Sequence, residues 1–199
     1  KIYLKDINSL KSEKALKYLN TDIFLIAGYP QILKKKIYTI PKIIALNLHG
    51  GPLPSYRGGS PLNWQIINGK KNIGVSLVKI NSKIDGGKII DTKFFRLKPF
   101  QDIKIAHKKA NKLFFIMVKN FLNNLKKTKK ILYKKKLGSS KYWRQRTDKD
   151  GELDFNNKNS YECLNFIRAI SFPYPGAWIS YKTRNSKFLR IFKAKPTNI

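Results

Sequence analysis

Cysteine is nearly absent from this chain of 199 residues, which contains only Cys163. A single cysteine excludes a disulfide framework and a cysteine-rich metal site, and it fits a reducing cytoplasm. The sequence has no apolar run near the roughly 18 residues of a membrane span and no visible signal peptide. We therefore expect a cytoplasmic protein without a membrane partner. Because the chain begins with Lys1 rather than methionine, we also expect that its true N-terminus precedes this sequence.

Acidic residues are scarce: 11 Asp and Glu stand against 42 Lys and Arg, which gives a formal net charge of +31. One explanation is a polyanionic partner such as RNA or a phosphorylated substrate. The other is a coding bias, because the lysine excess accompanies abundant Ile and Asn, as an AT-rich genome would give. The lysines are spread along the chain and no nucleic-acid recognition motif accompanies them, so we favour the compositional explanation.

Apolar patterning predicts an α/β fold with alternating strands and helices, and the 42% of hydrophobic residues suffices for a core. The runs at 22–29 and 42–48 are continuously apolar, as expected of parallel strands covered on both faces. Pro61 at a first helical position and Asp102 as a cap indicate two helix starts. We expect strands at 1–4, 22–29, 42–48, 72–80 and 88–98, helices at about 9–19, 60–68, 102–125 and 160–170, and a hairpin of 177–181 with 187–194.

The stretch "ALNLHGGPLPSYRGGSPLNW" (45–64) carries the chemistry of the chain. Asn47 and His49 lie where a strand ends, and strand alternation places both on the same side. Ligands of parallel α/β sheets bind beyond the carboxyl ends of the strands. An Asn amide and a His can donate to a developing oxyanion, and the His can also move a proton. Asp85, 36 residues after His49 and directly before two glycines, is the candidate carboxylate to orient that His.

Each of these residues also has an ordinary interpretation. A His at a strand end is commonly only hydrogen-bonded, and an Asp before Gly-Gly is commonly turn chemistry. The prediction therefore depends on the combination of the three residues with the neighbouring loop. His107 is expected to be structural or solvated, and Cys163 to be a small buried hydrophobe. No metal is expected, because no His, Cys or carboxylate cluster has ligand spacing.

The stretch "LNLHGGPLPSYRGGSPLNWQIINGKKNIGVSLVKINSKIDGGKII" resembles the folate-dependent formyltransferases, a family that includes methionyl-tRNA formyltransferase and the sugar-nucleotide N-formyltransferases. Its signature combines Asn-x-His, an L-P-x-(Y/W)-(R/K)-G loop and a later Asp. The resemblance implies a Rossmann-like formyltransferase domain with a mostly parallel sheet, followed by the start of a C-terminal β-barrel. The division expected is a catalytic domain at 1–125, a linker at 126–150, and a connecting helix with the first β hairpin at 151–199. The family's opening strands have no counterpart here, so truncation at both ends is expected.

The same resemblance implies the site. The co-substrate would be 10-formyltetrahydrofolate, with Asn47 and His49 stabilising the oxyanion and Asp85 orienting His49 and helping to take the proton of the amine. Family contacts to the pterin fall on the backbone of Gln31, Ile32 and Leu33 and on the loop of Asn81, Ser82, Lys83 and Ile84. The entrance for the acceptor falls on Gly51, Pro52, Leu53, Pro54, Tyr56 and Arg57.

Several acceptors fit this chemistry. The segments "SPLNW" and "PYPGAW" resemble the sugar-nucleotide enzymes, so a nucleotide-linked amino sugar is the preferred acceptor. Charged initiator tRNA is the alternative, because its phosphates would suit a charge of +31. Glycinamide ribonucleotide is third, since its enzymes usually lack the C-terminal extension. A further alternative of another class is a noncatalytic basic RNA-binding domain, against which the intact Asn47, His49 and Asp85 argue.

Overall fold

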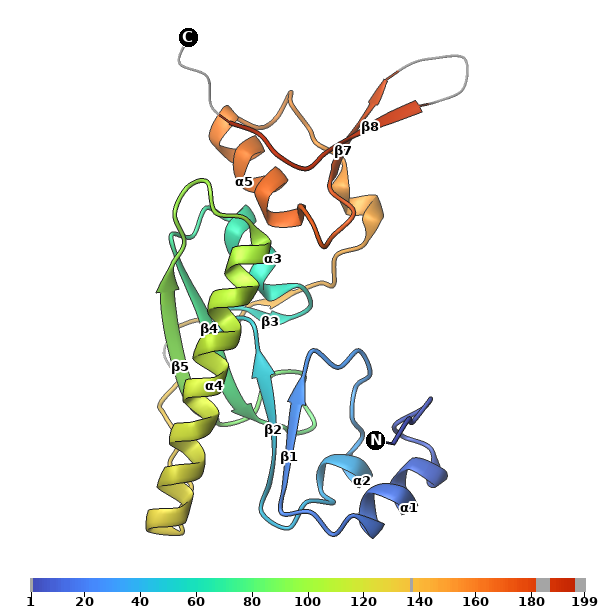
Figure 1. Ribbon diagram of the computed structural model, residues 1–199, viewed down its shortest axis with the longest axis vertical. Coiled ribbons are helices and arrows are strands. Elements are labelled where there is room, and N and C mark those ends of the chain that lie inside the picture. The colour runs from blue at the N-terminus through green and yellow to red at the C-terminus, as the bar shows by residue number, and fades with distance from the viewer. Residues whose placement is uncertain (1, 137, 182–186, 196–199) are drawn as a thin grey trace.

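The computed structural model describes residues 2–136, 138–181 and 187–195 (Figure 1). Among them a four-stranded sheet has the order β1-β2-β4-β5. Its strands are β1 (Ile23–Ala27), β2 (Ile44–His49), β4 (Asn72–Lys79) and β5 (Ile89–Arg96). This α/β arrangement of strands and helices confirms the fold class that the sequence predicts.

The sheet is mixed, whereas the sequence predicts a mostly parallel one. Strands β1 and β2 are parallel, but β2 pairs antiparallel with β4, and β4 antiparallel with β5. The connection 80–88 between β4 and β5 is too short for a parallel crossover, which needs about a dozen or more residues. The prediction of parallel pairing is therefore confirmed for β1 and β2, and β4 and β5 pair antiparallel instead.

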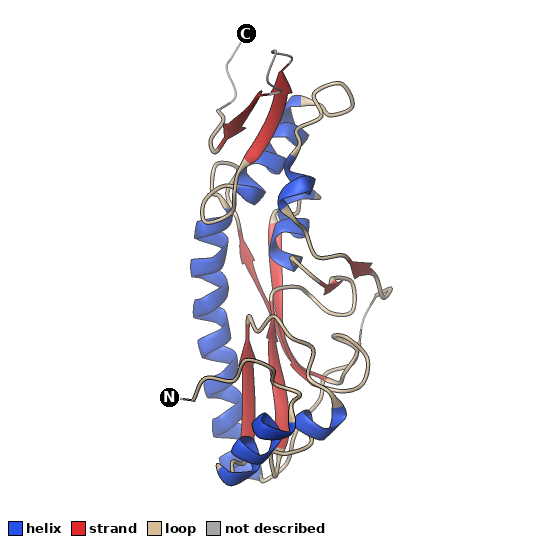
Figure 2. Cartoon of the chain, turned by 90° about the vertical axis from the view of Figure 1, so that its right-hand side faces the viewer, coloured by secondary structure: helices blue, strands red, loops and turns tan. Residues whose placement is uncertain are grey.

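Five α-helices are described. Ser9 caps α1 (Leu10–Tyr18) by accepting from the Ser12 amide, and Asp102 caps α4 (Ile103–Thr128) by accepting from the Ile105 amide. Helix α4 lies along one face of the sheet against β4 and β5 (Figure 2). The other helices are α2 (Lys35–Tyr38), α3 (Pro61–Ile67), with Pro61 at its first position as predicted, and α5 (Ser160–Ile170). No described helix is long and apolar enough to cross a membrane.

One hydrophobic core joins the sheet, α4 and the C-terminal helix α5. The buried residues of this core include Leu46, Ile73, Val75 and Leu77 from the sheet, Ala106, Ala110, Met117 and Phe121 from α4, and Phe166 and Ile167 from α5. The small Ala106 and Ala110 let α4 approach the sheet closely.

Two features at the N-terminal side differ from the expectation. Residues 2–4 form no strand, and the side chains of Ile2 and Tyr3 are exposed. Strand β1 is an edge strand in the described chain, with Leu25 46% exposed, so its apolar run is not covered on both faces. A short apolar sequence fixes the extended conformation but not the number of neighbours.

The segment 126–150 pairs with the rest of the chain at two places. Strand β6 (Tyr142–Trp143) pairs parallel with β3 (Arg57–Gly58), and Lys134 bridges Ile89 of β5. A 3-10 helix follows at Asp148–Gly151. The predicted C-terminal hairpin is confirmed, with β7 (Ala177–Tyr181) antiparallel to β8 (Lys187–Ile191). The division of the chain into three regions stays a prediction.

Candidate active site

Asn47, His49 and Asp85 converge, as the sequence predicts. Asn47 and His49 lie on β2, and His49 is its last residue. Asp85 lies in the β4–β5 connection with a φ of +47°, in the left-handed region that Asp tolerates better than most residues. Its Oδ1 atom is 3.2 Å from Asn47 Nδ2, which donates to it, and 3.5 Å from His49 Nδ1. One carboxylate therefore faces both polar side chains of the strand end.

The His49 ring is buried, with acceptors at both of its nitrogens. Nε2 is 2.5 Å from the carbonyl oxygen of Tyr56, and Nδ1 faces Asp85. The side chain is only 5% exposed. A doubly protonated imidazolium can donate to both oxygens, while a neutral ring donates to one of them. Acceptor oxygens therefore face both ring nitrogens, an arrangement suited to a His that handles a proton.

The second oxygen of Asp85 is also bonded. Oδ2 accepts from the backbone N–H of Gly58, 3.0 Å away. Gly58 has a φ of +95°, and a Cβ there would lie 2.2 Å from the carbonyl oxygen of Trp143. Only glycine fits this position, so the glycine of the L-P-x-Y-R-G loop is explained by backbone packing beside the carboxylate.

The expected acceptor entrance is for the most part a packed loop. Gly51, Leu53, Pro54 and Tyr56 are buried, while Pro52 and Arg57 are partly exposed. The side chains of Leu53, Pro54 and Tyr56 therefore support the loop and do not project outward. Arg57 extends from it and donates through Nε to the carbonyl of Ile84, 2.9 Å away.

Two buried polar residues that the sequence analysis missed hold this loop. Ser76 Oγ donates to the Gly51 carbonyl at 2.8 Å and accepts from the Leu53 amide at 3.1 Å. Gln65 Nε2 donates to the Gly50 carbonyl at 2.8 Å, and its Oε1 accepts from Gly74 at 2.7 Å. Both are buried polar residues inside an otherwise apolar strand or helix, and that pattern is the signal that could have found them.

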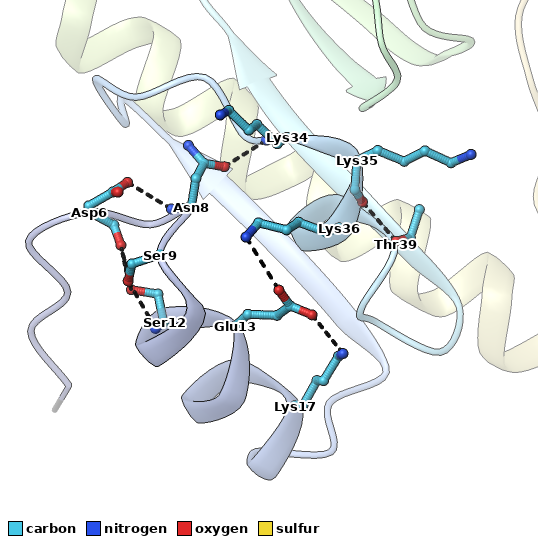
Figure 3. A network of polar contacts seen from close by, with 10 residues as sticks. All are labelled: Asp6, Asn8, Ser9, Ser12, Glu13, Lys17, Lys34, Lys35, Lys36 and Thr39. Carbon is cyan, nitrogen blue, oxygen red and sulfur yellow. Dashed lines mark hydrogen bonds and ion pairs between the residues drawn. The ribbon is translucent and has the colours of Figure 1, made fainter.

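The first loop assigned to the pterin is tied to the segment before α1. Gln31 turns inward, where its side chain accepts from the Ile7 amide and donates to the Lys5 carbonyl. Asn8 donates to the Ile32 carbonyl at 2.9 Å and accepts from the Lys34 amide at 2.8 Å (Figure 3). The amides of Ile32 and Leu33 have no protein partner among the described residues.

The second loop assigned to the pterin is exposed along 81–84. Asn81 Oδ1 accepts from the Lys83 amide at 3.0 Å, which closes a turn directly before Asp85. In both loops a polar side chain bonds backbone groups, Asn8 in the first loop and Asn81 in the second.

The other residues singled out from the sequence lie outside this constellation. His107 Nε2 is 3.1 Å from the Tyr174 hydroxyl, and burial lowers the pKa of His107. Cys163 is buried on α5, as expected. No group of three His, Cys, Asp or Glu side chains in the described ranges could hold a metal ion.

Comparison with known proteins shows which family this chain resembles. A model of the formyl transferase family matches residues 7–113, and one of the formyl transferase C-terminal domain matches 146–199. The chain is 37% identical over 184 residues to the bifunctional polymyxin resistance protein ArnA of Wigglesworthia glossinidia brevipalpis, covering 88% of this chain and 27% of that protein. It is 31% identical over 180 residues to a methionyl-tRNA formyltransferase of Caldanaerobacter subterraneus subsp. tengcongensis, covering 90% and 57%.

A solved structure shares the fold. A sugar N-formyltransferase from Shewanella sp superimposes with a TM-score of 0.75 at 19% identity, covering 98% of this chain and 77% of that one. The chain spans only part of the length of the relatives it matches, 27% and 57% for the two named above. Both family models match in the expected order along the sequence. The chain belongs to the formyl transferase family.

Proposed function

We propose that the protein transfers a formyl group from 10-formyltetrahydrofolate to a primary amine. The observation that carries the proposal is the convergence of Asn47, His49 and Asp85 at the end of β2. Acyl transfer to an amine needs donors for a developing oxyanion and a group that manages a proton. An amide, an imidazole and a carboxylate within hydrogen-bonding or ion-pairing reach supply both.

Attack of the amine on the formyl carbon places negative charge on the formyl oxygen. Asn47 Nδ2 carries two N–H bonds, of which Asp85 accepts one, so the second can donate to that oxygen. His49 Nε2 donates to the Tyr56 carbonyl in this structure. His49 would join the oxyanion hole by shifting that hydrogen bond to the formyl oxygen.

Proton transfer completes the reaction. The attacking amine loses a proton, and Asp85 carries the negative charge that can receive it or support the charge on His49. Collapse of the intermediate breaks the bond between the formyl carbon and the folate nitrogen, and that nitrogen takes up the proton given up by the amine and leaves as tetrahydrofolate. We assign the pterin to the backbone of Ile32 and Leu33 and to the loop 81–84, whose exposure fits this role.

A nucleotide-linked amino sugar is the acceptor we propose, from the resemblance of "SPLNW" and "PYPGAW" to the sugar-nucleotide enzymes. Charged initiator tRNA is the second candidate, favoured by the net charge of +31. Within "SPLNW", Asn63 donates to the Ala169 carbonyl and Trp64 to the Arg144 carbonyl. These two side chains therefore serve packing, and the choice of acceptor needs a direct assay.

The test is formyl transfer by the full-length protein from 10-formyltetrahydrofolate, run in parallel on charged initiator tRNA and on nucleotide-linked 4-amino sugars. We expect turnover of a sugar, and loss of about 100-fold or more in kcat for His49→Ala. His107→Gln, at the chain's other histidine, is the matched control and should keep full activity. Turnover of charged tRNA alone would overturn the proposal that the acceptor is a nucleotide-linked amino sugar. A protein that transfers to neither amine and binds RNA with steep salt dependence would overturn the enzyme proposal.

A further inference from the structure

We propose that Trp143 is a positioning residue that sets the geometry of His49 and Asp85 through the backbone of the loop 54–59. This inference deepens the proposed formyl transfer and rests on it. Trp143 lies between the two matched family regions, which end at residue 113 and begin at residue 146. From its sequence context alone it belongs to a basic linker.

The segment 141–143 is bonded to the active-site loop along its length. Strand β6 runs parallel to β3, with Arg57 opposite Tyr142 and Gly58 opposite Trp143. The hydrogen bonds include one from the indole itself, whose Nε1 donates to the Ser55 carbonyl at 3.0 Å. The backbone bonds are Lys141 N–H to the Pro54 carbonyl (3.2 Å), Arg57 N–H to the Lys141 carbonyl (3.0 Å) and Gly59 N–H to the Trp143 carbonyl (2.8 Å).

The indole also contacts two aromatic rings. It stacks on Tyr56 with centroids 5.3 Å apart and an interplanar angle of 7°, and lies 5.1 Å from Trp64 at 36°. Lys141 Nζ lies 4.2 Å from the indole centroid. Tyr56 is 7% exposed and Trp143 is partly buried, so the stack packs against the interior through its Tyr56 side.

The loop that Trp143 holds contacts two members of the constellation through backbone atoms. The Tyr56 carbonyl accepts from His49 Nε2, and the Gly58 amide donates to Asp85 Oδ2. The bonds from segment 141–143 fall at 54, 55, 57 and 59, on both sides of these two groups. A shift of the loop would therefore move the partners of His49 and Asp85 together.

Misplacement of reacting groups by about 1 Å can cost on the order of 100-fold in rate. Trp143→Ala removes the ring that contacts Tyr56 and Trp64, together with the bond to Ser55. We expect kcat to fall about 10- to 100-fold, while KM for the folate changes less than about threefold. Trp143→Phe keeps a stacking ring, and it should restore kcat to within about fivefold of the wild type.

Two further variants make the test specific. Trp143→Leu fills part of the space of the indole without aromatic stacking, and it replaces Trp143→Ala in the test if the alanine variant does not fold. The kcat of Trp143→Leu should fall by the same amount as that of Trp143→Ala, about 10- to 100-fold. Phe155→Ala, which removes a 57% exposed aromatic ring 12 residues further along the chain, should leave kcat unchanged. A wild-type kcat in both the alanine and leucine variants overturns the proposal.

A readout without turnover separates this proposal from the proposed function. The ¹⁵N signals of the His49 imidazole should shift in Trp143→Ala and stay near wild type in Trp143→Phe and Phe155→Ala. A loss of kcat with unchanged His49 signals overturns the positioning role. If the wild-type protein transfers formyl to no amine, the proposed function fails, and the His49 spectrum still reports whether Trp143 positions the ring.

Discussion

Asp85 connects three segments of the chain at the scale of single atoms. Its two oxygens face Asn47 and His49 of β2 and the amide of Gly58 in β3. Its left-handed φ of +47° turns the side chain back from the β4–β5 connection toward the end of β2. Two N–H donors, Asn47 Nδ2 and the Gly58 amide, hold the carboxylate in place, and Oδ1 also faces the His49 ring.

Replacing Asp85 by Asn should lower kcat for formyl transfer about 100-fold or more at pH 7. Asn tolerates the left-handed conformation as well as Asp does, so the fold should be retained while the charge facing His49 is lost. Steady-state kinetics at saturating amine check this, with Asp91→Asn on β5 as the control. A kcat within threefold of wild type would contradict the role given to Asp85.

The side chains of the site could be predicted from the sequence, but their backbone partners could not. Strand alternation places Asn47 and His49 on one side, and this is confirmed. The Tyr56 carbonyl and the Gly58 amide carry no side-chain signature, so their contacts with His49 and Asp85 depend on the folded loop. Catalytic roles for all of these residues stay predictions.

Most secondary-structure elements were predictable from their apolar pattern, and the two-residue strands β3 and β6 were not. Helices α3, α4 and α5 and strands β2, β4 and β5 lie close to their expected ranges. Strand β6 has two residues, which is too short to show a period. The antiparallel direction of β4 depends on how the chain returns from α3, a property that a strand's own composition does not contain.

The loop before α2 owes its conformation to Asn8, which donates to the Ile32 carbonyl. Asn8 also accepts from the Lys34 amide (Figure 3). Asn8→Ala should raise KM for 10-formyltetrahydrofolate about fivefold, because each lost bond costs on the order of 1 kcal/mol of loop ordering. The cap of α1 is Ser9, so the helix should persist. Folate titration under initial-rate conditions tests this, with the exposed Asn111→Ala as the control. A change confined to kcat would argue against a folate-binding loop.

Across the whole molecule, buried polar contacts join the C-terminal segment to the sheet domain. Arg168 of α5 donates to the carbonyls of Lys98 and Gln101, just before α4. Asn63 of α3 reaches the Ala169 carbonyl, and His107 of α4 meets the hydroxyl of Tyr174. The regions matched by the two family models thus form one packed body, as Figure 1 shows by the placement of α5 against α3.

His107 makes this junction sensitive to mild acid. Burial lowers its pKa below the ordinary 6.5, so the folded state favours the neutral ring and the unfolded chain binds the proton more readily. This contribution to stability is fully present above about pH 6.5 and declines as the pH falls through the folded-state value. Tm should fall between pH 7 and 5, and His107→Gln should reduce that fall. An identical pH profile for the variant would show that other groups are responsible.

The large positive net charge should make the thermal stability of the protein depend on salt. With 42 basic and 11 acidic residues, repulsion among like charges destabilises the compact state. Salt screens the few ion pairs too, but exposed pairs are worth only about 0–1 kcal/mol each, so relief of repulsion should dominate. Raising NaCl from about 20 to about 300 mM should therefore increase Tm by several degrees. Potassium acetate at equal ionic strength should give the same rise, because screening depends on ionic strength. A flat or falling Tm would mean that pairs such as Arg144–Asp150 and Arg190–Asp148 outweigh the excess of lysine.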